Sequence, residues 1–128
     1  MTPGVTIEIA NRSGAKVDEE AAAELARQVL AAEGIHDGDL GLVFVAPGEM
    51  RGLKRDHLGQ DEPTDVLAFP IDGREDLPPG LPRQLGDAVL CPQVVGEAWR
   101  APLVHALLHL LGYEHGSEMA TREAELGR

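Results

Sequence analysis

The sequence predicts a single α+β domain, spanning residues 1–128, in which a small mixed sheet of about four strands is packed with helices. Three observations lead to this fold class. A chain of 128 residues, 43% of them hydrophobic, suffices for one compact core. Short strand patterns alternate with longer helix patterns, and no internal repeat interrupts them. Aromatic residues make up only 3%, so the core must consist mainly of Val, Leu, Ile and Ala.

The first half of the chain alternates strand and helix patterns. Residues 5–9 alternate apolar and polar side chains, which predicts a half-buried strand. Residues 18–33 predict a helix, because acidic residues crowd the first turn, alanines fill the middle and Gly34 follows the end. Residues 40–45 predict a second strand, and the segment from 49 to about 57 predicts a short helix.

The second half continues with two more strands and then becomes helical. Residues 66–69 are a short apolar run that predicts a buried strand, whereas residues 71–85 contain three prolines and two glycines and predict a surface loop. Residues 88–91 predict the fourth strand. Helical patterns follow at residues 102–111 and from 117 to about 126.

The composition indicates the cellular compartment in which the protein is expected to work. The single cysteine, Cys91, excludes an internal disulfide and suits a reducing cytoplasm. No apolar run approaches the ~20 residues of a membrane span, and the N-terminus lacks a basic segment followed by an apolar one. We therefore expect a soluble cytoplasmic protein without a membrane partner.

The charge balance argues against a general affinity for nucleic acids. A formal net charge of −11 repels polyanions, so an RNA substrate would require a local positive track. The densest basic stretch contains Arg51, Lys54 and Arg55. An exposed helix face explains this stretch as well as RNA binding does.

Three of the five histidines lie within eleven consecutive residues. Residues four apart share one face of a helix, so His105 and His109 can reach the same ion. Gly112 lets the chain turn back, and His115 can then supply a third nitrogen. Three protein ligands with an open fourth position are typical of a hydrolytic zinc site, where the pKa of bound water falls to roughly 7. The spacing predicts one Zn²⁺ ion, although nickel or copper would also bind imidazoles.

Two alternatives compete with a zinc hydrolase that acts on RNA. A histidine pair at this spacing is more often a surface pair or a satisfied core pair, but neutral imidazoles in a leucine-rich helix need polar partners, which a shared metal provides. The same spacing occurs in metzincin proteases, where a glutamate follows the first histidine as general base. Here that position is Ala106, which disfavours a metallopeptidase.

Three segments together resemble the YbeY-type bacterial endoribonucleases. They are residues 63–70 (PTDVLAFP), residues 85–92 (LGDAVLCP) and the histidine segment ending in LGYEH. The resemblance covers most of the chain from about Leu40. It implies a single α+β domain with a three-histidine metal site, usually zinc, and a single-strand-specific endoribonuclease. It further implies maturation of ribosomal RNA, notably at the 3′ end of 16S rRNA, and ribosome quality control with ribosomal proteins as partners.

Departures from the family pattern concern the catalytic side chains. Leu58 stands where the family usually has an arginine, and Arg55, one helical turn earlier, could bring a guanidinium to the phosphate instead. Glu114 replaces the usual aspartate and could orient a ligand or transfer a proton, or be a solvated turn carboxylate. Asp65 or Asp87 could hydrogen-bond a ligating histidine or cap a turn. Either water or the RNA 2′-OH could attack. A non-catalytic ribosome-associated factor with a structural metal remains a further alternative.

Overall fold

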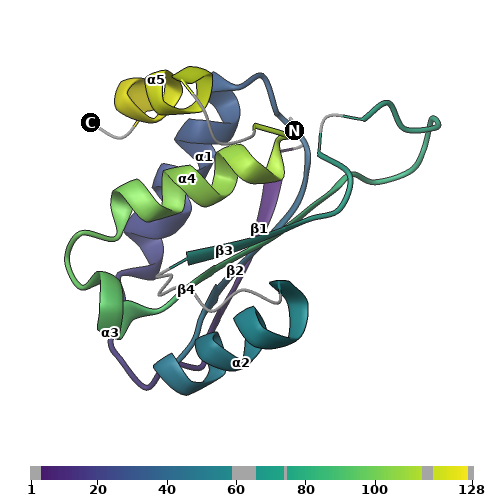
Figure 1. Cartoon of the computed structure of the whole chain (residues 1–128). Helices are drawn as coiled ribbons and strands as arrows, with labels where there is room; N and C mark the ends of the chain where they lie inside the picture. Colours follow the sequence, from purple (N-terminus) through teal and green to yellow (C-terminus); the bar gives the residue numbers. More distant parts are fainter. Residues whose placement is uncertain (1–3, 59–65, 74, 114–116, 127–128) are drawn as a thin grey trace.

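The computed structural model describes residues 4–58, 66–73, 75–113 and 117–126 (Figure 1). Strands and helices alternate first, and helices then follow one another to the C-terminus. The elements are β1 (Val5–Asn11), α1 (Glu19–Ala32), β2 (Gly38–Phe44), α2 (Pro47–Leu58), β3 (Val66–Pro70), β4 (Gln84–Leu90), α3 (Pro92–Val95), α4 (Arg100–Leu110) and α5 (Ser117–Leu126).

The four strands form one mixed sheet in the order β1-β2-β4-β3. β1, β2 and β4 run parallel, and β3 pairs antiparallel with β4 at the edge. The predicted α+β fold with a small mixed sheet is thereby confirmed. Most element boundaries differ from the prediction by one or two residues, and the largest error is at β4, which begins at Gln84, inside the segment predicted as loop. The described parts of the connection, residues 71–73 and 75–83, lie in a loop that extends away from the body, in agreement with the predicted surface loop (Figure 1).

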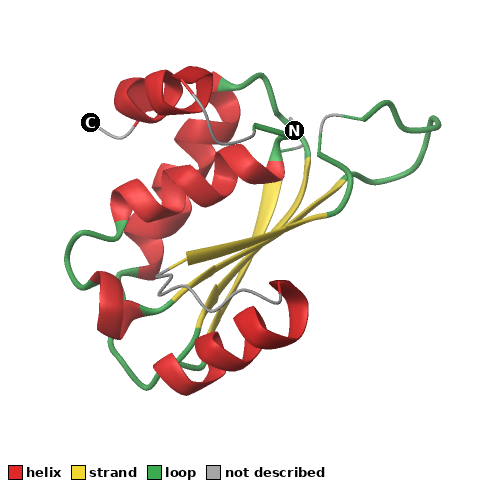
Figure 2. Ribbon diagram, viewed as in Figure 1, coloured by secondary structure: helices red, strands yellow, loops and turns green. Residues whose placement is uncertain are grey.

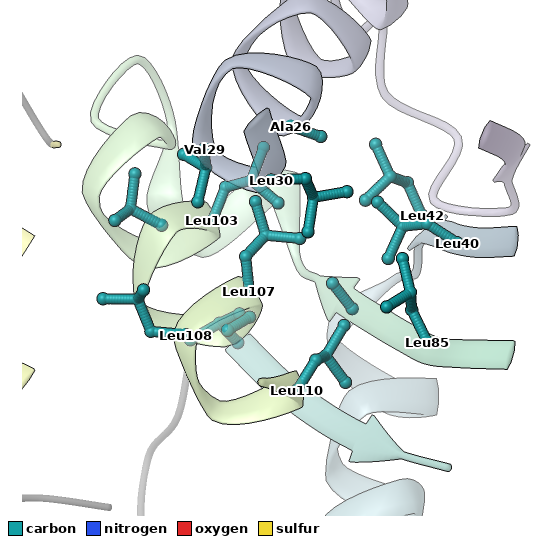
Figure 3. Close-up of a cluster of buried hydrophobic side chains, with 14 of the residues drawn as sticks. Ala26, Val29, Leu30, Leu40, Leu42, Leu85, Leu103, Leu107, Leu108 and Leu110 are labelled. Atoms are coloured by element: carbon teal, nitrogen blue, oxygen red, sulfur yellow. The ribbon is translucent and has the colours of Figure 1, made fainter. Parts of the chain in front are cut away.

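Helices cover both faces of the sheet. α1, α4 and α5 lie on one face and α2 lies on the other (Figure 2). The larger core lies beneath α1 and α4, where Leu30, Leu42 and Leu107 are fully buried (Figure 3). Full burial of each such side chain contributes about 1.5–3 kcal/mol. A smaller cluster, which includes Met50 and Val89, lies beneath α2. Because leucines anchor α4 in the larger core, the helix that carries two of the predicted metal ligands is rigidly placed.

Gly86 in β4 permits the close approach of two neighbours. It has a φ of +124°, and a Cβ at this position would lie 2.2 Å from the Phe69 carbonyl oxygen and 3.1 Å from the Leu110 side chain. Glycine is therefore the residue that fits between β3 and the last turn of α4. This contact fixes the distance between the sheet and the end of the histidine-bearing helix.

Candidate metal centre

His105 and His109 lie on consecutive turns of α4, as their spacing predicted. Their Nε2 atoms are 3.2 Å apart, and their rings are 4.6 Å apart between centroids with an interplanar angle of 80°. Both side chains are half-buried. Two imidazole nitrogens therefore converge on one point at the surface of α4. The other two predicted site residues of this segment, Glu114 and His115, lie outside the described residues.

The remaining ring nitrogens identify the tautomer of each histidine. His105 Nδ1 lies 2.8 Å from Glu123 Oε1, and His109 Nδ1 lies 2.9 Å from the Tyr113 carbonyl oxygen. A carboxylate and a carbonyl can only accept, so each Nδ1 carries the hydrogen and donates it. In the neutral rings, both Nε2 atoms consequently present lone pairs. This is the arrangement found in histidines that bind metal ions through Nε2.

The distance between these two nitrogens fits a shared zinc ion. Two nitrogens bound at about 2.0–2.1 Å to a tetrahedral ion are separated by about 3.3 Å, compared with the observed 3.2 Å. Two lone pairs held this close repel each other unless a cation or a proton lies between them. Within the ranges the structure describes, no group of three His, Cys, Asp or Glu side chains is placed to hold a metal. The third ligand predicted at His115 therefore remains a proposal.

Gly112 ends α4 and sets the position of the Tyr113 carbonyl. Its φ is +97°, its N–H donates to His109 O, and the Tyr113 N–H donates to Leu108 O. These two bonds form a Schellman motif, for which glycine is the favoured residue. The reversal brings the Tyr113 carbonyl back to His109 Nδ1. The turn that was predicted to return the chain toward the metal thus also orients one of the ligands.

Glu123 is the site residue that the sequence reasoning missed. It lies in α5, eighteen positions after His105, and no local spacing pattern connects the two. The carboxylates considered for this role were Asp65, which lies outside the described residues, and Asp87. The Asp87 side chain lies over Gly41, and in β4 it alternates with Ala88, whose side chain joins the core beneath α4. Asp87 therefore faces the side of the sheet that α2 covers.

Arg55 lies on α2, on the opposite face of the sheet from α4 (Figure 2). Its side chain is 77% exposed and contacts Asp56 at 3.4 Å. The three side chains of the predicted basic stretch do not form one exposed face. Arg51 and Arg55 are exposed, whereas Lys54 is only 6% exposed. The structure therefore brings His105 and His109 together but places Arg55 apart from them.

Comparisons with known proteins agree on one family. The family model described as Endoribonuclease YbeY matches residues 8–126. The Endoribonuclease YbeY of Acidothermus cellulolyticus is 42% identical over 93% of this chain and 84% of its own length. That of Salinispora tropica is 40% identical over 93% of this chain and 88% of its own. The solution structure of TM1509 from Thermotoga maritima is 28% identical and has a TM-score of 0.60, covering 95% of this chain and 87% of that one.

Proposed function

The chain belongs to the YbeY endoribonuclease family, and from this premise we propose that it cleaves single-stranded RNA at a zinc centre formed by His105, His109 and His115. One observation supports the metal above all others: both described histidines donate Nδ1–H to an acceptor and direct Nε2 toward a common point. A cation bound by both Nε2 atoms would account for this arrangement.

Residues of this chain would bind the metal, orient its ligands and transfer protons. A bound zinc ion would supply Lewis-acid chemistry that polarises a phosphoryl oxygen. His105 and His109 hold the site, and Glu123 and the Tyr113 carbonyl fix their ring orientations. We assign Glu114 to moving a proton between the attacking and leaving oxygens. Whether the attacking oxygen belongs to water or to the RNA 2′-OH, these residues do the same work.

The proposed substrate is ribosomal RNA in its single-stranded regions, including the 3′ end of 16S rRNA, with a further role in ribosome quality control. The acidic chain, with a net charge of −11, has little general attraction for RNA. Ribosomal proteins would then supply much of the docking energy, in the cytoplasm. Among the described residues, no helix combines the length and apolarity that crossing a membrane requires.

Metal removal tests the proposed function directly. Protein treated with a chelator should lose cleavage of a single-stranded RNA oligonucleotide, and stoichiometric Zn²⁺ should restore it, because the histidines alone provide no Lewis acid. Gel assays should compare that oligonucleotide with its duplex and with a peptide library. Unchanged cleavage after metal removal would contradict the metal centre. Zinc-loaded protein that binds RNA without cutting it would favour the non-catalytic factor, and peptide turnover would favour the metallopeptidase.

Arg55 is proposed to contact an RNA phosphate from the opposite face of the sheet. An RNA strand that binds at the histidines and passes around the β3 edge of the sheet would reach this exposed guanidinium. For R55A we expect weaker RNA binding, and the slope of log K against log salt should become shallower by about 0.7, the value for one phosphate on a single strand. The salt dependence of binding, measured by fluorescence anisotropy, checks this.

The matched control for Arg55 is R27A, which removes an exposed arginine from α1 instead of α2. It lowers the positive charge by the same amount, so any general effect of net charge appears in both variants. Equal salt slopes for R55A and R27A would remove Arg55 from the RNA-binding surface.

A further inference from the structure

We propose that α5 is a positioning element for the metal centre, which holds Glu123 against His105 and thereby raises the affinity of the site for its metal ion. Glu123 acts through His105 and is a positioning residue. The inference rests on the proposed metal centre and adds to it a residue that no motif identified.

The contact itself has the geometry of a strong, directional hydrogen bond. His105 Nδ1 and Glu123 Oε1 are 2.8 Å apart, which is typical when the acceptor is ionised. The two side chains are 28% and 32% exposed, so solvent screens the pair less than it screens a fully exposed ion pair. The contact therefore holds the His105 ring in one orientation and its hydrogen on Nδ1.

Neighbouring residues in α5 keep Glu123 in place. Met119, one helical turn earlier, is buried in the main core. Arg122 donates to Glu33 Oε2 at 2.5 Å and to the Ala32 carbonyl at 3.1 Å, both at the C-terminal end of α1. The hydrogen bond to Glu33 raises the pKa of Arg122 above its usual value, so this anchor is charged throughout the working pH range. α5 is thus fixed to both α1 and α4 (Figure 1).

A carboxylate at this position does more than a neutral acceptor would. Its charge stabilises positive charge that develops on the imidazole, so the Nε2 lone pair becomes a stronger ligand. At the corresponding nitrogen, His109 donates to a neutral acceptor, the Tyr113 carbonyl. His105 is therefore the described ligand whose ring N–H faces a charged acceptor. Outer carboxylates of this kind typically change metal affinity by about 10–100-fold.

Zinc affinity of the full chain, measured by competition with a chromophoric chelator, tests the proposal. For E123A we expect affinity to fall by about 10–100-fold, and for E123Q to fall less, because the amide oxygen still accepts the hydrogen bond without the charge. The control is E24Q, which removes the same single charge from an exposed carboxylate of α1 whose partner is Gln28. Its zinc affinity should match that of the parent protein.

A second readout needs no metal. In the metal-free parent protein, the ¹⁵N shifts of His105 should show hydrogen on Nδ1, and in E123A they should show a mixture of both tautomers. Thermal unfolding of the metal-free variants separates an affinity change from a folding defect. If E123A does not fold, E123Q decides the matter, because an unchanged zinc affinity in folded E123Q would overturn the proposal.

Failure of this inference is distinguishable from failure of the proposed function. Parent protein that binds no zinc, or binds it as tightly after H109A, would reject the metal centre itself. Tight zinc binding that H109A weakens and E123A leaves unchanged would reject only the role of Glu123.

Discussion

Replacing His109 with alanine is expected to reduce cleavage of single-stranded RNA by about two to three orders of magnitude, the loss that follows removal of a group that stabilises transition-state charge. The substitution removes one of the two Nε2 atoms that lie 3.2 Å apart. Of the three proposed ligands, only His105 and His115 would then remain, and two ligands hold a zinc ion less tightly than three. Initial rates on a labelled oligonucleotide, together with zinc content by mass spectrometry, measure both consequences.

The control for this experiment is H36A, because His36 is exposed and lies in the loop between α1 and β2. Its rate and zinc content should equal those of the parent chain. H109A should also retain its fold, since the side chain is half-buried and its hydrogen-bond acceptor is a carbonyl at the helix end. Matching circular dichroism spectra would establish this. Folded H109A that cleaves RNA at the parental rate would rule out a catalytic metal at this site.

Features of the site that depend on residues close together in the sequence could be predicted from the sequence. The four-residue spacing of His105 and His109 fixes their relative placement once a helix forms. Gly112 likewise ends that helix through contacts that span five positions. Leucines around the pair predicted a helix buried in the core, and the structure agrees. Each of these inferences needed only the geometry of one helix and its cap.

Parts that depend on tertiary packing could not be predicted. Glu123 reaches His105 only because α5 folds back onto α4. The local sequence around Glu123 does not distinguish it from several other acidic residues of the chain. Burial of Lys54 depends in the same way on which side of α2 meets the sheet. The start of β4 at Gln84 was hidden because prolines and glycines dominate the preceding segment. Pairing with β2 and β3 supplies the hydrogen bonds that make those residues a strand.

The second large effect is expected from a substitution at Gly86, the glycine of the LGDAVLCP segment. We expect G86A to lower the free energy of unfolding by about 2–6 kcal/mol, because strain at positive φ and overpacking each cost about 1–3 kcal/mol. The new Cβ would lie 2.2 Å from the Phe69 carbonyl oxygen. No side-chain rotation relieves that contact, because the position of Cβ is set by the backbone and its partner is a backbone carbonyl oxygen. Urea denaturation followed by circular dichroism measures the change.

G52A is the matched control, because Gly52 lies within α2, has no atom within 4 Å of an added Cβ and lacks a positive φ. There alanine should stabilise the protein by about 0.5–1 kcal/mol through its better helix propensity. Opposite signs for the two variants would show that the effect at Gly86 comes from its surroundings and not from glycine in general. A G86A variant as stable as the parent would contradict the close approach of β4 to Phe69.

The way G86A relieves its clash bears on the metal centre. If β3 and β4 separate at Phe69, α4 keeps its place and the folded fraction should bind zinc with parental affinity. If the last turn of α4 moves away, Leu110 takes its neighbour His109 and the following Gly112 turn with it. The His109 hydrogen bond to Tyr113 would then loosen, and zinc affinity would fall in the folded fraction as well. Because Phe69 lies in β3, which pairs with a single strand among those the structure describes, separation of β3 from β4 is the expected route.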